Sequence, residues 1–220
     1  MSKLVSVSGA AGTEKSTLLE GLRYRVDKFR VARAILRKMK MDLYDILKDP
    51  VKTMEFQDLI LDWKITNDES LKDDHEVEWT FVERCPADFY AFAKTWQPLF
   101  NSREYDEWLI EYHSECFAAM KHYDVAILLP PGKFSHVDDG VRAKADTQEV
   151  THRELNTFLA RRWMDANFAR PCFHVHRMIS SLPEDRILEV DLALAEANVY
   201  FRTLKELLLS SEPLSVNSVI

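Results

Sequence analysis

Residues Gly9 to Thr17 constrain the fold of this chain more than any other segment. They read Gly-Ala-Ala-Gly-Thr-Glu-Lys-Ser-Thr, follow a short apolar run at Leu4–Ser8, and precede leucines at helical spacing. The segment matches the phosphate-loop pattern G-x-x-x-x-G-K-[ST] except at the second glycine, which is Glu14. In such a loop, backbone N–H groups and the start of a helix surround a phosphate. The sequence therefore predicts a strand, a phosphate-binding loop and a helix in this order.

The loop also predicts how a nucleoside triphosphate is held. We expect Lys15 to reach the β- and γ-phosphates of ATP and the Ser16 hydroxyl to bind Mg²⁺. The side chain of Glu14 stands where the pattern has bare backbone, so we expect it to crowd and repel the phosphates and to weaken ATP binding. The predicted ATP-binding residues of the loop are Gly9, Ala10, Ala11, Gly12, Thr13, Glu14, Lys15, Ser16 and Thr17.

Short apolar strands alternate with helical segments along the rest of the chain. Further strands are expected at Glu78–Val82, Asp124–Leu129 and Phe173–Met178. Helices are expected at Phe29–Met39, at Leu43–Lys64 with a break at Pro50, from Pro86, and at Tyr105–His122, Glu149–Trp163 and Glu184–Leu209.

This alternation favours a parallel sheet that is covered by helices on both faces. We therefore expect an α/β fold, namely a P-loop NTPase three-layer sandwich with a mostly parallel sheet. It would form a single domain over residues 1–220, with a lid at about 131–148 and a flexible tail at about 210–220.

An acid and an arginine, Glu83 and Arg84, follow the second expected strand. Ligands of open parallel sheets bind at the carboxyl ends of the strands, which is also the edge that carries the loop. Glu83 is thus a candidate to deprotonate or orient an acceptor or to help hold Mg²⁺, and Arg84 to bind substrate or the transferring phosphoryl group. The alternative is a structural ion pair that caps the next helix. Asp88 is a further candidate substrate contact, although a carboxylate in a first helical turn is stabilising in any case.

The segment after the third strand, Pro130 to Lys144, is polar and rich in turn residues. A loop that closes there would exclude water and bring Arg142 or Lys144 onto the phosphates. The alternative is a solvated connection.

The charge is distributed unevenly along the chain. The net charge of −7 argues against a protein whose whole surface binds nucleic acid. The stretch from Arg23 to Lys40 nevertheless contains one acid, Asp27, and eight basic residues. These are Arg23, Arg25, Lys28, Arg30, Arg33, Arg37, Lys38 and Lys40. Such a face suits an anionic substrate, small or polymeric, and it is also compatible with a solvated helix face.

Other patterns narrow the class of protein. No apolar run is long enough to cross a bilayer, and the first residues lack the features of a secretory signal, so a cytoplasmic location is expected. Three cysteines without a CxxC pair indicate free thiols.

Two histidines, His174 and His176, share one face of an expected strand, but no third ligand follows at a suitable spacing, so no zinc site is expected. One aromatic residue near the cleft, either Phe89, Tyr90 or Trp96, is a candidate to stack on a nucleobase.

Three motifs occur in the order found in a known family. They are the loop at residues 9–17, Glu83-Arg84-Cys85-Pro86-Ala87-Asp88, and Pro130-Pro131 followed by Asp138-Asp139-Gly140-Val141-Arg142. From about Leu4 to Leu188 the chain resembles the AAA-type ATPase and kinase family that includes ribosylnicotinamide-kinase-like domains and phage-encoded nucleotide kinases. The Glu83–Arg84 pair resembles that of deoxynucleoside kinases, and its surroundings resemble those of thymidylate kinases.

This resemblance implies roles for several residues. Lys15, Ser16 and Thr17 would bind ATP with Mg²⁺, and Arg142 would be the arginine of the lid. Arg186 would lie near the adenine, and Arg33 would lie on the substrate side.

We therefore expect ATP- and Mg²⁺-dependent phosphoryl transfer to a nucleotide or nucleoside, with Lys15, Glu83, Arg84 and Arg142 as catalytic residues. The expected enzyme is a cytoplasmic monomer or homodimer, in the host cytoplasm if it is phage-encoded. One alternative is a kinase that acts on a modified base, such as 5-hydroxymethyluracil, in phage DNA, which the basic run would bind. The other is a nucleotide-binding regulatory module whose catalysis has lapsed because of Glu14.

Overall fold

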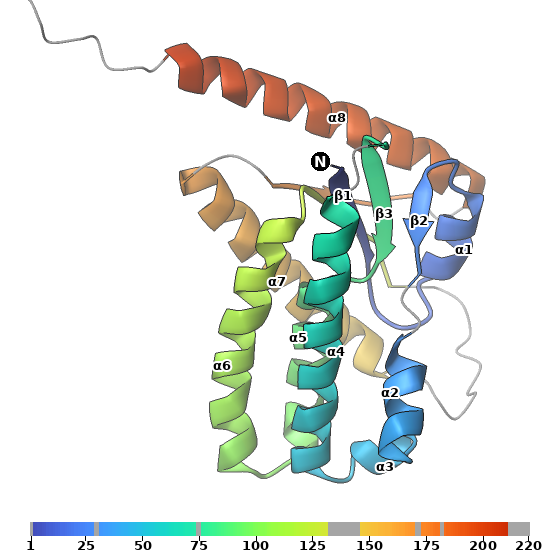
Figure 1. Cartoon of the computed structure of the whole chain (residues 1–220), viewed down its shortest axis with the longest axis vertical. Helices are drawn as coiled ribbons and strands as arrows, with labels where there is room; N and C mark the ends of the chain where they lie inside the picture. Colours follow the sequence, from blue (N-terminus) through green and yellow to red (C-terminus); the bar gives the residue numbers. More distant parts are fainter. Residues whose placement is uncertain are drawn as a thin grey trace, which may run out of the picture.

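Five parallel strands form the central sheet of the protein (Figure 1). The computed structural model describes residues 2–28, 31–73, 76–131, 146–169, 173–180 and 183–210. The strand order is β2-β3-β1-β4-β5. The strands are β1 (Lys3–Ser8), β2 (Arg25–Asp27), β3 (Trp79–Glu83), β4 (Val125–Leu128) and β5 (His174–Arg177).

Strand β1 occupies the centre of the sheet. It pairs with β3 from Lys3↔Trp79 to Val7↔Glu83, and with β4 from Val5↔Val125 to Ser8↔Leu128. Because all pairs are parallel, the carboxyl ends of the strands meet at one edge.

Helices cover both faces of this sheet, which gives three layers (Figure 1). One face carries α1 (Lys15–Gly21) and α8 (Pro183–Ser210). The other face carries α2 (Val31–Met39), α4 (Pro50–Lys72), α5 (Pro86–Trp96), α6 (Arg103–Ala119) and α7 (Asp146–Ala169). The short helix α3 (Leu43–Ile46) and two 3₁₀ turns, Gln97–Leu99 and Met120–His122, complete the described elements. The predicted α/β fold is confirmed.

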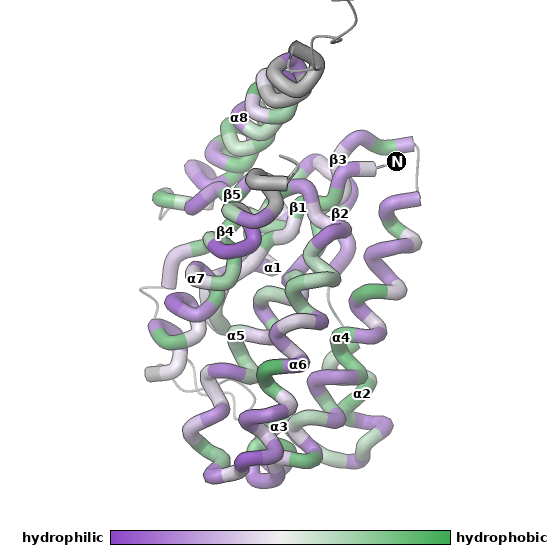
Figure 2. Tube along the Cα trace, turned by 90° about the vertical axis from the view of Figure 1, so that its left-hand side faces the viewer, coloured by the Kyte–Doolittle hydropathy of each residue, from purple (hydrophilic) through white to green (hydrophobic). Residues whose placement is uncertain are grey.

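Two hydrophobic cores lie on opposite sides of the sheet because the side chains of a strand alternate between its faces. In β1, Leu4 belongs to the core under α4–α7, whereas Val5 and Val7 belong to the core under α1 and α8. Helix α8 lies along the outside of the molecule and alternates between hydrophobic and hydrophilic residues (Figure 2). Because helices bury the sheet on both faces, the strand sequences consist mainly of apolar residues.

Local sequence signals set the starts of the helices that matter for the site. The Asp49 carboxylate accepts hydrogen bonds from the N–H groups of Val51 and Lys52, and Pro50 occupies the first turn of α4. The expected break at Pro50 is therefore a helix start. Pro86 opens α5 in the same way.

One strand was not predicted from the sequence. The edge strand β2 lies within the basic run, pairs with β3 alone and contains one apolar residue, Val26. Such a short polar strand has no apolar periodicity to detect. The expected tail and most of the expected lid, including Arg142 and Lys144, lie outside the described residues. Within the described part of the chain, no helix combines the length and the apolarity needed to cross a membrane.

Candidate nucleotide and acceptor site

The predicted phosphate loop connects the carboxyl end of β1 to the start of α1. Two of its positions require glycine: a Cβ on Gly9 would lie 2.8 Å from Thr13 Oγ1, and Gly12 has a φ of +78°. Among the described contacts, the backbone N–H groups from Ala10 to Glu14 donate to no acceptor of the protein. A row of such donors is what an anion-binding loop requires.

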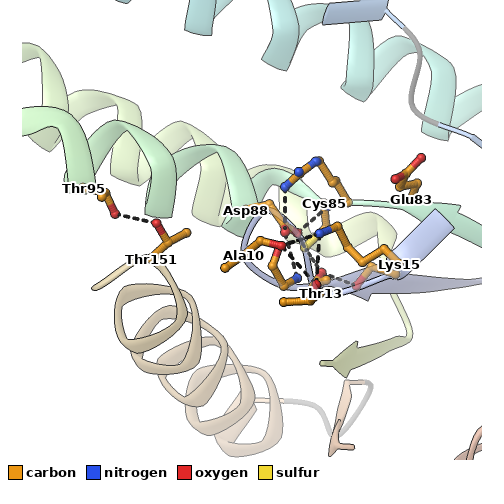
Figure 3. Close-up of polar contacts among 12 residues, drawn as sticks. Ala10, Thr13, Lys15, Glu83, Cys85, Asp88, Thr95 and Thr151 are labelled. Atoms are coloured by element: carbon orange, nitrogen blue, oxygen red, sulfur yellow. Dashed lines mark hydrogen bonds and ion pairs between the residues drawn. The ribbon is translucent and has the colours of Figure 1, made fainter. Parts of the chain in front are cut away.

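The ammonium group of Lys15 lies within this loop (Figure 3). It donates to the carbonyl oxygens of Gly9 at 2.8 Å and Ala10 at 2.7 Å, and lies 3.2 Å from Thr13 Oγ1. The residue is only 5% exposed. The loop thus concentrates a buried cation and several N–H groups in one small region.

Glu14 adopts the left-handed conformation that the missing glycine would favour, with φ 61° and ψ 30°. Its Oε2 atom lies 3.3 Å from Nη1 of Arg186 in α8. The buried Arg186 also donates to the carbonyl oxygens of Ser180 at 3.0 Å and Thr13 at 3.4 Å. The Glu14 carboxylate therefore has a cationic partner. The sequence-based expectation that Glu14 repels phosphate did not take this partner into account.

A pair of oxygen ligands lies beside the loop. The Ser16 hydroxyl donates to Oε1 of Glu83, at the end of β3, over 2.9 Å. Adjacent ligands of an octahedral Mg²⁺, with metal–oxygen bonds of about 2.0–2.1 Å, are also roughly 2.9 Å apart. These two oxygens therefore fit the Mg²⁺ position that the loop motif implies.

Asp88 ties the end of β1 to the end of β3. Its carboxylate accepts from the N–H groups of Gly9 at 3.1 Å and Cys85 at 3.0 Å, and its exposed fraction is zero (Figure 3). Arg84 pairs with it at 3.5 Å. Asp88 therefore positions the loop from beneath and is not among the residues that line the cavity described below, where a substrate contact was predicted for it.

The neighbouring Cys85 thiol is buried together with Asp88. Burial raises the pKa of Cys85 to about 12. The thiol is consequently protonated near neutral pH and packs as a small apolar group. Cys116 is likewise free and buried.

A cavity of about 640 Å³ opens next to the Ser16–Glu83 pair. Arg84 stands at this polar end and Arg33 of α2 contributes a second cation. The remaining walls come mainly from α2, α4 and α5, and include Leu36, Phe56, Ile60, Phe89, Phe92 and Trp96. Of the three aromatic candidates, Phe89 and Trp96 line the cavity, whereas Tyr90 packs elsewhere, against His113 and Phe158.

Arg84 is held tightly at the mouth of this cavity. Its φ is +64°, its N–H donates to the carbonyl oxygen of Val7, and its guanidinium lies 4.7 Å from the ring centre of Phe92. Left-handed backbone in a residue with a long side chain is uncommon, and such conformations cluster at functional sites.

Sequence reasoning missed several residues of this site. Gln148 of α7 donates to the carbonyl oxygen of Ala11 over 2.8 Å, and Phe56 and Gln57 reach the cavity from α4. No motif marks them, because they are brought to the site by packing between helices far apart in the sequence.

Acidic side chains accompany two members of the basic run in the described residues. Arg23 pairs with Asp191 at 3.1 Å, and Lys28 pairs with Glu20 at 2.8 Å. Lys28, Glu20 and Arg33 all line the cavity. The acidic partners reduce the charge available to a polyanion.

The comparisons with known proteins agree with this geometry. A sequence model of a family described as an AAA domain matches residues 4–171, well over half of the chain. Among solved structures, the thymidylate kinase from Candida albicans is similar, with a TM-score of 0.62 and 11% sequence identity over 91% of this chain and 93% of that chain. This likeness shows a shared fold. No curated protein matches. The chain therefore belongs to the AAA-domain family of P-loop proteins, on the fold that it shares with thymidylate kinase.

Proposed function

We propose that the protein transfers the γ-phosphoryl group of ATP, with Mg²⁺, to a nucleotide or nucleoside bound in the 640 Å³ cavity. One observation carries this proposal: the polar end of the cavity, with Ser16, Glu83 and Arg84, lies directly beside the phosphate loop. The volume lies within the range of about 300–1,000 Å³ typical of small-molecule sites.

Different residues in and beside the phosphate loop would bind the phosphates of ATP and its metal ion. The loop N–H groups and Lys15 would bind the phosphates, while Ser16 and Glu83 would hold the metal. Bound Mg²⁺ supplies charge neutralisation at the transferring group. Arg84, and Arg142 from outside the described residues, would add positive charge, because phosphoryl transfer depends mainly on positioning and electrostatics.

The walls of the cavity suit a nucleotide acceptor. Phe89 and Trp96 offer ring faces for a base, and Arg33 offers a planar cation that can bind a phosphate through two hydrogen bonds. Glu83 would orient the acceptor group or deprotonate an acceptor hydroxyl. The presence of Arg33 favours a nucleoside monophosphate over an uncharged nucleoside.

An acceptor panel tests this function. ADP release and phosphorylated product would be measured with Mg²⁺-ATP and each common nucleoside and nucleoside monophosphate. We expect Lys15→Met to abolish product formation. Arg33→Met should raise KM for a monophosphate at least tenfold and leave KM for ATP unchanged, whereas the exposed Lys52→Met on α4 should behave like the parent protein. Absence of product from every acceptor would refute the proposal.

Two alternatives are separated by the same assay. An oligonucleotide with 5-hydroxymethyluracil in the panel tests for a kinase of modified DNA, whose binding should weaken steeply with salt. ATP binding without turnover on any acceptor would indicate a regulatory nucleotide-binding module.

A further inference from the structure

Three metal-ligating side chains meet where β5 lies beside α8, away from the phosphate loop. His174 and His176 point to the same side of β5, and Glu196 reaches them from α8. One ligand atom from each residue lies within 4.8 Å of the other two. Oε2 of Glu196 is 3.3 Å from Nδ1 of His176 and 3.9 Å from Nε2 of His174.

The orientation of His176 is set by a second glutamate. Its Nε2 atom lies 3.0 Å from Oε1 of Glu189, so the ring proton is best assigned to Nε2. The lone pair on Nδ1 then faces the Glu196 carboxylate. With this tautomer, a metal ion between Nδ1 and Oε2 of Glu196 would take both atoms as ligands. A histidine that donates one N–H to a carboxylate while its other nitrogen binds metal is the usual arrangement in metal sites.

His174 provides an independent observation. Its Nε2 atom is buried and, within the described residues, has no hydrogen-bond partner. The ring itself is held against Tyr200, with ring centres 5.7 Å apart. Buried polar atoms are normally paired, and each exception needs an explanation such as an ion.

We propose that His174, His176 and Glu196 bind one Zn²⁺ ion per chain. In a tetrahedral zinc site with bonds of about 2.0–2.1 Å, neighbouring ligand atoms are roughly 3.3 Å apart, so the observed separations need only small side-chain movements. Imidazole nitrogens favour zinc over Mg²⁺, which keeps this site distinct from the Ser16–Glu83 pair. The Glu196 side chain is 59% exposed, which leaves the fourth position open to water.

The site would fasten the edge strand β5 to α8. Glu189 also accepts hydrogen bonds from the N–H groups of Ile179 at 2.7 Å and Ser180 at 2.9 Å, so the same helix holds the segment that follows β5. The expectation that the histidine pair lacks a third ligand is corrected, because the ligand comes from α8 and not from a neighbouring position in the sequence. This inference does not depend on the proposed kinase activity.

Zinc titration of the full chain tests the site. Protein dialysed against EDTA and then against metal-free buffer would be titrated with Zn²⁺ in competition with a chromophoric chelator. We expect one equivalent to bind, a rise in Tm on addition of Zn²⁺, and intense visible bands with Co²⁺ in its place, as tetrahedral Co²⁺ gives.

Matched variants locate the binding. Glu196→Gln removes the more exposed ligand, and His174→Gln removes a ligand whose Nε2 atom is buried. Each variant should weaken Zn²⁺ binding at least a hundredfold and abolish the rise in Tm. Glu189→Gln should weaken it by roughly 10–100-fold. Glu206→Gln, an exposed carboxylate further along α8, is the control and should bind like the parent protein. Far-UV circular dichroism in EDTA verifies that each variant is folded.

Either of two results overturns the site. One is the absence of saturable binding to the parent protein at micromolar Zn²⁺. The other is a Glu196→Gln variant that is folded and binds one equivalent with the parent's affinity.

Discussion

The ion pair between Glu14 and Arg186 predicts a thermodynamic coupling that ATP binding can measure. Replacement of Arg186 by Met would leave the Glu14 carboxylate without the cation that now lies 3.3 Å away. A negative charge about 8 Å from a phosphate charge, at an effective dielectric constant of about 20, costs on the order of 2 kcal/mol. We therefore expect Arg186→Met to weaken ATP binding roughly tenfold to hundredfold.

The same substitution should matter less when Glu14 is Gly. Loss of the Arg186 charge is common to both backgrounds, but only with Glu14 present does it also free a carboxylate to turn toward the phosphates. Glu14→Gly removes left-handed strain worth about 1–2 kcal/mol. It also adds backbone entropy to the unfolded chain, worth about 0.5–1 kcal/mol, and loses the ion pair. The free energy of unfolding of Glu14→Gly should thus stay within about 1 kcal/mol of the parent.

Calorimetric titration of the parent, both single variants and the double variant with Mg²⁺-ATP provides the coupling free energy. We expect about 1–2 kcal/mol. Free energies that add to within about 0.3–0.5 kcal/mol would refute the idea that Arg186 neutralises Glu14. A Glu14→Gly variant that alone binds ATP a hundredfold more tightly would refute it as well, and would favour the lapsed-enzyme alternative.

Three further predictions concern buried side chains. Asp88→Ala removes two charge-assisted hydrogen bonds worth about 1.5–3 kcal/mol each. It should lower the free energy of unfolding, measured in urea, by about 3 kcal/mol, and it should raise KM for ATP. An unchanged KM would show that the loop holds its shape without the carboxylate. Lys64 pairs with Asp68 at 2.8 Å, and both side chains are 1% exposed. Lys64→Met leaves the Asp68 carboxylate buried without its cation and should lower the free energy of unfolding by about 3–5 kcal/mol. The double variant Lys64→Met with Asp68→Leu should lose clearly less, and equal losses would contradict this explanation. Iodoacetamide at pH 8 should leave Cys85 unmodified in the folded protein, because the thiol is buried and its pKa is about 12. Mass spectrometry should find Cys85 alkylated after unfolding in urea. Rapid labelling of Cys85 in the native protein would contradict this.

Apolar runs and one motif were sufficient to predict the three-layer fold, because strands buried on both faces must be apolar and the loop must follow a strand. The edge strand β2 could not be predicted from the sequence, because Arg25 and Asp27 flank its single apolar residue. Its pairing with β3, and not its composition, makes it a strand.

The candidate site was predictable mainly where its residues follow strands, and Arg33, Phe89 and Trp96, which line the cavity from helices, were named as candidates as well. Ser16 and Glu83 were expected to help hold the same metal, and the structure places Ser16 Oγ 2.9 Å from Glu83 Oε1. The partner of Glu14 could not be predicted, since Arg186 is 172 positions away, and the third ligand of the histidine pair comes from another element. Contacts between elements depend on packing, which has no fixed spacing in the sequence.

The central position of β1 has a consequence for how the protein opens. Both edges of β1 are hydrogen-bonded, and Leu4 to Ser8 are buried, so its amide protons should exchange with solvent only on global unfolding. Strand β2, paired on one edge alone, should exchange much sooner. The phosphate loop is therefore anchored to the slowest-opening part of the molecule, while the cavity beside it is walled in part by α2, a helix of nine residues that is not part of the sheet.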